Sequence, residues 1–327
     1  MARFQCLTFL TDYGLEDGFA AVCHGVAAQI APELHITDIT HLIPPGDIRR
    51  GAVVLAQAVP YFPPAVHVAV VDPGVGTARR GVAVQAGQSL FVGPDNGLLP
   101  PALAVAGGAT RAVSLTNTAL WRDTTAATFH GRDVFMPVAA RLAAGLPLAA
   151  AGEPTEVTSL VTLPPPECRL TANGAQVEVV TVDRFGNAQL SLPGRDASLA
   201  GLTLGATVTL SWDDGTATAP FGRTFGDVAP GGLLCYTDSG GWVAIAVAGG
   251  DAAARLGLRA GTRITLSGGA AGARGTELAD TGPTAPGRPP CHEIVDAPHV
   301  SVLMGTWPHQ GRFSSSQPLY RRPSSVL

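Results

Sequence analysis

The sequence predicts an α/β protein with two domains: an N-terminal α/β sheet domain with Rossmann-like layers, and a smaller C-terminal all-β domain. Apolar runs of strand length alternate with helical patterns over residues 1–150, whereas short β-rich runs separated by glycine turns fill residues 170–268. Hydrophobic residues make up 46% of the chain and charged residues 14%. At 327 residues, the chain is long enough for two domains that each bury a core.

The strands of the N-terminal region are short apolar runs. We expect them at Leu7–Thr11, Leu34–Ile39 and His67–Val71. The first and third of these runs lead directly into aspartates, Asp12 and Asp72.

Helical spacing of apolar residues separates these strands. Residues 19–30 carry such spacing, with Asp17 as the expected N-cap, and Asp47 is expected to cap a helix that ends at Ala58. A further helix is expected where Phe135 and Leu142 share one face. Alternation of strands and helices is typical of a largely parallel sheet.

The pattern changes after residue 150. Residues 151–169 are rich in proline and are expected to form a linker, and residues 170–268 read as a barrel or sandwich. One short helix is expected at Asp251–Leu256, with Gly257 ending it. Residues 269–327 are rich in Gly, Pro and Ser and are expected to form a disordered tail. The β-domain strands are expected at Val177–Val182, Thr207–Trp212, Leu233–Tyr236, Trp242–Val247 and Arg263–Leu266.

Composition excludes several classes of function. A formal charge of −4 and a pI near 6.0 give no reason to expect a nucleic-acid or anionic-membrane partner. The sequence contains no lysine, so any active cation is an arginine or a histidine. The five cysteines form no CxxC pair, which disfavours a metal knuckle. No signal-peptide pattern or membrane-length apolar run is present, so we expect a cytoplasmic protein.

Three polar residues stand where α/β sheets place their catalytic groups, near the carboxyl ends of strands or before a helix. They are Asp12 in TDYG, Asp72 in VVDPGVGTARRG and His130 in TFHGRDVF. Each has a structural alternative. Asp-Pro-Gly is a good turn by composition alone, and an isolated histidine is more often structural than catalytic. GVGTARRG lacks both the lysine and the GxGxxG spacing of a phosphate loop.

Taken together, the polar segments resemble one family. TDYGLEDGFA, ITDITHLIPPGDIRRGA, YFPPAVHVAVVDPGVGT, VGPDNGLL, TFHGRDVF, VDRFGN and RTFGDVAPG follow in order between residues 11 and 231. This series resembles the S-adenosylmethionine hydrolases, also called hydroxide adenosyltransferases, which are related to the fluorinases and chlorinases. The likeness covers roughly residues 5–268.

The resemblance implies a homotrimer with active sites between neighbouring subunits, with S-adenosylmethionine as the substrate and with neither cofactor nor metal. It implies a catalytic set that falls on Asp72, Arg79 and His130, and ribose binding by Asp12. The remaining substrate contacts that it implies are Asp183, Asn187 and Ser239 at the methionine end and Phe225 near adenine.

The implied reaction is attack of water on the ribose C5′, with methionine leaving from its sulfonium. We expect Arg79 to favour the developing hydroxide while Asp72 and His130 orient it and pass on its proton. Aligning the ribose, the task expected of Asp12, contributes more than a positioned base does. Oriented geometry supplies about 7–11 kcal/mol, whereas a base contributes about 10²–10⁴-fold in rate. The halogenases are expected to carry tyrosine at the positions of Asp72 and His130, so the sequence disfavours halide transfer.

Two departures from the family pattern stand out. Cys23-His24-Gly25 replaces the usual Met-Lys-Gly, and AVAGGD near Ala248 lacks the usual asparagine, which puts side-chain contacts to adenine in doubt. Three alternatives stay open: a halogenase, a non-catalytic adenosine or S-adenosylmethionine binder, and an interaction protein that recruits partners through its tail.

Overall fold

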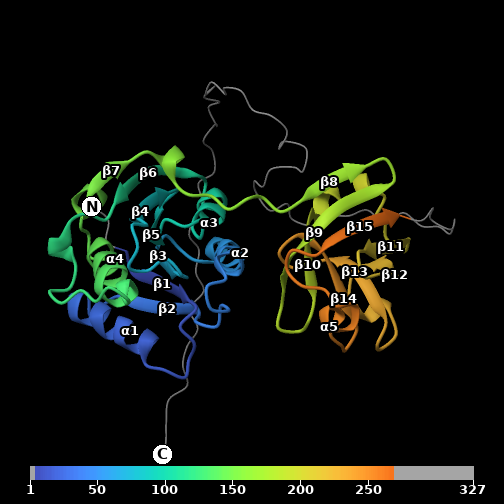
Figure 1. The fold of residues 1–327 in the computed structure, drawn as a ribbon, viewed down its shortest axis with the longest axis horizontal. Coiled ribbons are helices and arrows are strands. Elements are labelled where there is room, and N and C mark those ends of the chain that lie inside the picture. Colours follow the sequence, from blue (N-terminus) through green and yellow to red (C-terminus); the bar gives the residue numbers. More distant parts are fainter. Residues whose placement is uncertain (1–3, 269–327) are drawn as a thin grey trace, which may run out of the picture. The chain divides into compact units, whose positions relative to one another are not determined.

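In the N-terminal sheet, β1 (Cys6–Thr11) pairs in parallel with β2 (His35–Thr40) on one side and β3 (Val66–Val70) on the other. The computed structural model describes residues 4–268 (Figure 1). A fourth strand, β5 (Ser89–Pro94), runs parallel to β3. The three strands predicted from apolar runs are confirmed to within one residue at each end.

The other half of the sheet is antiparallel, which corrects the expected largely parallel arrangement. β4 (Gly81–Ala86) pairs antiparallel with both β5 and β6 (Ala109–Ser114). The reason is local. Only Gly87 and Gln88 separate β4 from β5, and Gly87 adopts a positive φ of 53°. Such a two-residue connection makes a hairpin, whereas parallel pairing needs a long crossover.

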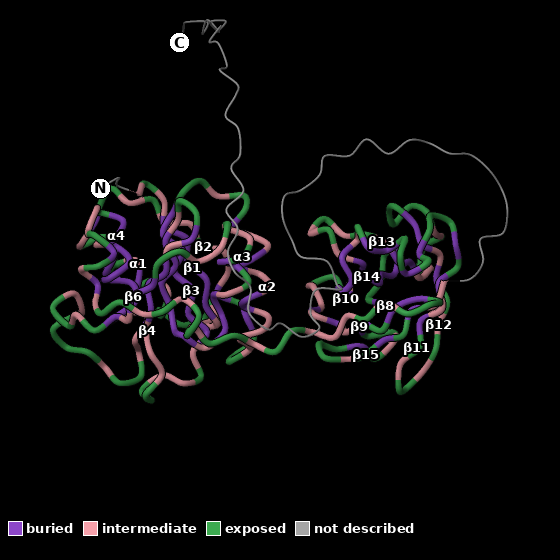
Figure 2. The backbone as a smooth tube through the Cα atoms, turned by 90° about the horizontal axis from the view of Figure 1, so that it is seen from above, coloured by how far each residue is buried: buried purple, intermediate pink, exposed green. Residues whose placement is uncertain are grey.

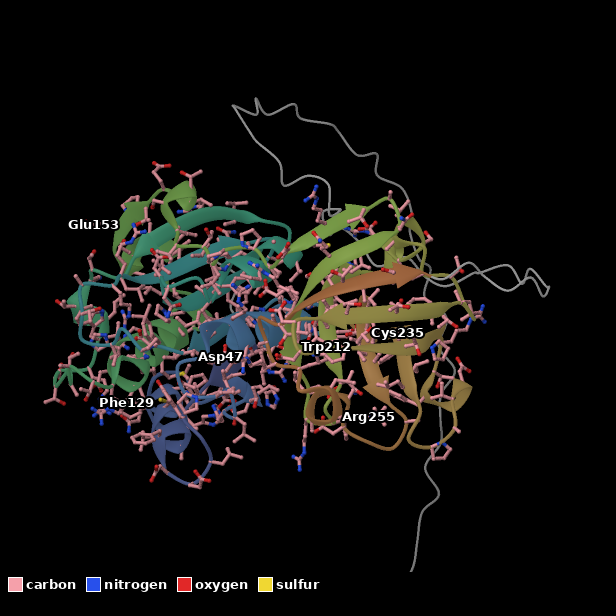
Figure 3. The ribbon with its side chains drawn as sticks, turned by 45° about the vertical axis from the view of Figure 1, so that its right-hand side comes forward. Asp47, Phe129, Glu153, Trp212, Cys235 and Arg255 are labelled. Atoms are coloured by element: carbon pink, nitrogen blue, oxygen red, sulfur yellow. The ribbon has the colours of Figure 1, made fainter. Side chains whose placement is uncertain are left out.

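The range expected to be a linker begins inside the N-terminal sheet, which corrects that boundary. β7 (Glu153–Thr155) pairs antiparallel with β6 and forms the last strand in the order β2-β1-β3-β5-β4-β6-β7. Pro154 is compatible with this place because an edge strand leaves one side of its backbone unpaired. Glu153, at the start of β7, is labelled in Figure 3.

Helices cover both faces of the sheet and create two cores (Figures 1 and 2). α1 (Phe19–Ile30) and α4 (Met136–Ala143) pack on the face that buries Phe9. α2 (Ile48–Ala58) and α3 (Pro100–Val105) pack on the opposite face. The domain is therefore a three-layer α/β/α unit, as predicted.

The two predicted N-caps in this domain have different outcomes. Asp47 caps α2 through its carboxylate, which accepts the Arg50 backbone N–H at 2.9 Å (Asp47 is labelled in Figure 3). The expected cap of α1 by Asp17 is wrong, because Gly18 holds the N-cap position and no side chain bonds there. The helix begins one residue too late for the Asp17 carboxylate to serve as its cap.

The C-terminal domain is a closed β-barrel rather than a sandwich. Its strands follow the order β10-β14-β13-β12-β11-β15-β9-β8, and the additional pairing of β9 with β10 closes the ring. The strands are β8 (Cys168–Thr171), β9 (Gly174–Val182), β10 (Ala188–Pro193), β11 (Thr207–Trp212), β12 (Gly215–Gly222), β13 (Leu233–Thr237), β14 (Trp242–Val247) and β15 (Arg263–Gly268). Leu190, Leu210 and Ile245 are fully buried in its core.

The short helix α5 (Ala252–Leu256) follows the capping prediction at both ends. The Asp251 carboxylate accepts the Ala254 N–H at 2.7 Å, and Gly257 adopts the left-handed conformation with φ of 66°. Trp212 on β11 and Cys235 on β13 are labelled in Figure 3.

None of the helices within residues 4–268 is both long and apolar enough to cross a membrane. The expected disorder of residues 269–327 lies outside the described residues.

A buried histidine on β3 makes the free energy of unfolding depend on pH. His67 is 1% exposed, its Nδ1 lies 2.8 Å from Thr8 Oγ1, and burial lowers its pKa to about 4. The unfolded chain, with a pKa near 6.5 for this group, binds more protons between pH 4 and 6.5. The stability contributed by neutral His67 is therefore complete above pH 6.5 and is lost as the pH falls toward 4.

We expect this histidine to lower the free energy of unfolding at pH 5 by roughly 2 kcal/mol relative to pH 8. Urea titrations of the wild type and His67→Asn at several pH values across this range measure how steeply the free energy of unfolding changes with pH in each protein; this pH dependence is the slope compared here. His35→Asn, which changes an exposed histidine on β2, is the matched control and should keep the wild-type slope. Equal slopes for wild type and His67→Asn would contradict the assignment.

Candidate active site

Parallel pairing of β1 and β3 brings two acids to the same edge of the sheet. Thr11 lies opposite Val70, so Asp12 directly follows β1 and Asp72 follows β3 by one further residue. Asn96, which follows β5, donates from Nδ2 to the Val71 carbonyl at 2.8 Å and thereby fixes the backbone just before Asp72. The predicted location of both acids at the carboxyl edge is confirmed.

The loop after Asp72 turns back on itself through local hydrogen bonds. Val75 N–H donates to the Asp72 carbonyl at 3.2 Å, and the Thr77 hydroxyl donates to the Gly74 carbonyl at 2.7 Å. Gly76 has a positive φ of 79°, and a Cβ there would lie 2.9 Å from the Ala127 carbonyl oxygen. A glycine is therefore required at this position, and the turn returns Arg79 to Asp72.

Arg79 lies between Asp72 and His130 and contacts both. Its Nε donates to the two Asp72 carboxylate oxygens at 2.9 and 3.0 Å, and its Nη2 also donates to Oδ2. The same Nη2 lies 3.0 Å from His130 Nδ1. The side chains of Arg79 and Asp72 are only 13% and 6% exposed. The structure thus brings together the three residues that the sequence proposed as one set.

The hydrogen bond from Arg79 determines the state of His130. A guanidinium carries only N–H donors, so Nδ1 of His130 must accept and the neutral ring carries its proton on Nε2. Burial, followed by the charge of Arg79, lowers the pKa of His130 below its ordinary value of 6.5. His130 is therefore neutral at pH 7, with Nε2–H as its remaining polar group.

A π-helical turn, Gly131–Phe135, follows His130 and places an aromatic ring against the arginine. The Arg79 guanidinium carbon lies 5.1 Å from the centre of the Phe135 ring, and Phe135 is 0% exposed. This cation–π contact stabilises a charge that is largely removed from water.

Tyr13 is a site residue that the sequence reasoning missed. Its ring packs 5.6 Å from that of Phe129, and a Cβ on Gly131 would lie 1.9 Å from its hydroxyl oxygen. Burial raises the pKa of Tyr13 well above 10, and the charges of Asp12 and Asp72 act in the same direction. Its position within TDYG, next to Asp12, was the available signal.

Asp12 is fixed from the loop before α2. Its Oδ2 accepts the Gly46 backbone N–H at 2.8 Å. The loop that carries Asp12 is held in turn by the Gly14 N–H, which donates to the His41 carbonyl at 2.8 Å.

The remaining predicted residues lie in the barrel domain. Asp183 and Asn187 share the β9–β10 turn, where Asp183 Oδ2 accepts from Asn187 Nδ2 at 2.8 Å. Asp183 Oδ1 accepts two further backbone N–H groups of the same turn. Its carboxylate therefore organises the turn, a role that the sequence did not predict. Ser239 lies in the separate β13–β14 turn.

Phe225 occupies a short helical turn after β12 and is 45% exposed. Its ring centre lies 5.2 Å from that of Tyr236 on β13. Burial, followed by the charges of Asp238 and Asp183, raises the pKa of Tyr236 to about 12. Because Phe225 packs on Tyr236 with only part of its surface, its exposed face is available for stacking.

The α/β/α domain carries the Asp–Arg–His set at its carboxyl edge and is followed by a closed barrel, and both domains match models of one enzyme family. A family model for the N-terminal domain of SAM hydroxide adenosyltransferases matches residues 7–152, and the model for the C-terminal domain matches residues 177–265. The chain belongs to the SAM hydroxide adenosyltransferase family.

Curated relatives include the (R)-S-adenosyl-L-methionine hydrolase of Salinispora tropica, which is 54% identical over 269 residues, or 82% of this chain and 100% of the relative. The enzyme of the same name from Thermus thermophilus is 42% identical over 266 residues, or 79% of this chain and 98% of the relative. A fluorinase from Actinopolyspora mzabensis is 26% identical over 289 residues, or 80% of this chain and 96% of the relative.

Two solved structures share the fold. An uncharacterized conserved protein from Thermotoga maritima matches with a TM-score of 0.75 and 35% identity over 80% of this chain and 99% of its own. A conserved hypothetical protein from Thermus thermophilus matches with a TM-score of 0.65 and 39% identity over 81% of this chain and 100% of its own.

Proposed function

We propose that this chain hydrolyses S-adenosyl-L-methionine to adenosine and L-methionine. The observation that carries the proposal is Arg79, which bonds Asp72 and His130 at once at the carboxyl edge of the sheet. Family membership and the names of the curated hydrolases, up to 54% identical, support the same reaction.

In the proposed reaction, a water oxygen forms a bond to the ribose C5′ while the bond from C5′ to the sulfonium breaks. Sulfur keeps the electron pair and leaves as the neutral thioether of methionine, and the water loses one proton. Because the leaving group is already activated by its charge, the protein mainly has to align the water and stabilise developing hydroxide.

Neither Asp72 nor His130 is a free base before the substrate binds. Both oxygens of Asp72 already accept from Arg79, and Nδ1 of His130 accepts from the same guanidinium. We therefore propose that the three side chains act as a unit. The guanidinium stabilises hydroxide, whereas Asp72 and His130 hold it in place and pass its proton outward.

The substrate contacts that we propose are spread over both domains. Asp12 would accept the ribose hydroxyls, and Asp183, Asn187 and Ser239 would hold the methionine end. Phe225, with its exposed ring, would pack near adenine.

We further propose a homotrimer with each site completed by a neighbouring subunit, acting in the cytoplasm without a cofactor and with no nucleic-acid or membrane partner. The proposed ranges are an N-terminal domain that extends through β7 and a barrel domain that begins with β8 at Cys168, two residues before the expected boundary, and ends at residue 268.

Halide transfer is the second candidate, because the chain is 26% identical to a fluorinase. The buried Asp72 carboxylate argues against it. A negative group at the point of attack repels a halide ion but accepts a hydrogen bond from water.

Chromatography of S-adenosylmethionine incubated with the protein, with and without chloride or fluoride, tests the proposal. We expect adenosine and methionine in equal amounts under every condition. The separated (R) and (S) sulfonium epimers should be supplied, because the relatives' names specify (R). A 5′-halogenated product would show a halogenase, and bound but unchanged substrate would show a binding protein. Either result would overturn the proposal.

A further inference from the structure

Two histidines and one aspartate meet beside the loop that carries Asp12. His24 comes from α1, Asp38 from β2, and His41 follows the end of β2. His24 Nε2 lies 2.8 Å from Asp38 Oδ1, and His41 Nε2 lies 3.2 Å from the same oxygen. One nitrogen or oxygen atom from each of the three residues lies within 4.8 Å of the others.

His41 is the most constrained member of this cluster. Its side chain is 3% exposed, and its Nδ1 bonds to Thr11 Oγ1 at 2.8 Å. Its Nε2, although near Asp38, makes no hydrogen bond to any described residue. A buried polar nitrogen without a partner costs about 1–3 kcal/mol, so this arrangement needs an explanation.

We propose that His24, Asp38 and His41 form a binding site for a divalent transition-metal ion, of which zinc is the best fit. Two imidazole nitrogens and one carboxylate oxygen are common zinc ligands, with water taking the fourth position. Two atoms that each lie about 2.0–2.1 Å from a tetrahedral zinc are about 3.3 Å apart. The distances from Asp38 Oδ1 to His24 Nε2 and to His41 Nε2, 2.8 and 3.2 Å, are close to that separation.

The surroundings of the cluster match those of a metal site. The bond from Nδ1 of His41 to Thr11 leaves Nε2 as the coordinating atom and fixes the ring, as a partner behind a metal-bound histidine does. Phe9 is 0% exposed and packs 5.0 Å from the His41 ring, which provides an apolar support. The side chains of His24 and Asp38 are 35% and 40% exposed, so an ion has access from solvent.

His24 is also one of the departures from the family pattern, where lysine is usual. An ammonium group cannot coordinate a metal, whereas an imidazole can. The proposed site is therefore a property of this chain's own residues, and it is separate from the catalytic set.

Zinc binding to the full-length protein, first treated with a chelator, tests the proposal by isothermal titration calorimetry. We expect one zinc ion to bind per chain. His24→Gln and Asp38→Asn should each weaken the affinity at least about tenfold. Circular dichroism confirms that each variant is folded. His35→Gln removes an exposed histidine of β2 outside the cluster and should bind as the wild type does.

A second measurement replaces zinc by cobalt(II). The visible absorption of a tetrahedral nitrogen and oxygen site should appear in the wild type and disappear in His24→Gln. The proposal is overturned if zinc does not bind, or if His24→Gln and Asp38→Asn bind it as tightly as the wild type does. The latter result would place the ion elsewhere in the chain. His24 and Asp38 would then be a hydrogen-bonded pair with His41 beside it, and not a metal site. Neither result depends on hydrolytic activity.

Discussion

Replacing Asp72 by asparagine is expected to lower kcat for S-adenosylmethionine hydrolysis by about 10²–10⁴-fold. Asparagine keeps the size of the side chain but loses its charge, and its amide nitrogen cannot accept a hydrogen bond from Arg79. The guanidinium would then keep one neutral amide oxygen as its acceptor at residue 72, in place of a charged carboxylate that accepts through both oxygens. Steady-state kinetics with separate determination of kcat and KM measures the effect.

Asp214→Asn is the matched control for this substitution. It makes the same chemical change at an exposed aspartate in the β11–β12 turn, and kcat should stay at the wild-type value. A rate within about threefold of wild type for a folded Asp72→Asn protein would contradict the proposed catalytic set.

The second large effect is expected for stability. Phe135→Ala should lower the free energy of unfolding by about 3–5 kcal/mol, because the ring is 0% exposed and its removal leaves a cavity beneath Arg79. A urea titration followed by circular dichroism measures this loss. Tyr61→Ala removes a ring that is 82% exposed and should change stability by less than about 0.5 kcal/mol.

Phe135→Leu separates packing from the cation–π contact. Leucine refills most of the cavity but offers no ring to the guanidinium, so stability should recover most of the way toward wild type. If Phe135→Ala is as stable as Tyr61→Ala, the ring does not support the site in the way described.

Local patterns in the sequence were sufficient for much of the fold. Asp47 and Asp251 could be predicted as N-caps because capping depends on residues within one turn of the chain. Strands β1 and β3 could be located because they are almost entirely buried apolar runs. The Asp17 prediction failed at a single residue, since the start of α1 depends on how the preceding loop packs.

Strand direction and barrel closure were beyond this reasoning. The antiparallel half of the sheet follows from the two-residue hairpin turn at Gly87. One glycine among the many in this sequence was not enough to identify that turn. The sequence left barrel and sandwich open, because both have short strands with glycine turns. The two pairings of β9, with β15 and with β10, decide between them, and the pairing with β15 joins segments far apart in the chain.

The catalytic set also could not be assembled from local sequence patterns alone. Asp72 and Arg79 belong to one loop, but His130 lies 51 residues beyond Arg79. Its place beside Arg79 came from the family resemblance rather than from any local pattern. Tyr13 was missed because its proximity to Gly131 exists only in the folded domain. The His24–Asp38–His41 cluster was missed for a similar reason, since its members come from a helix, a strand and a loop.

The pairing of Thr11 with Val70 also has a consequence for how this enzyme can vary. The separation between the two edge acids, Asp12 and Asp72, is set by strand alignment rather than by the conformation of a loop. Deleting one residue within β3 would move Asp72 by about 3.3 Å along the strand direction and turn its side chain toward the other face. Insertions between strands leave that alignment unchanged. Length changes during evolution should therefore accumulate in the connections and be absent from β1 and β3.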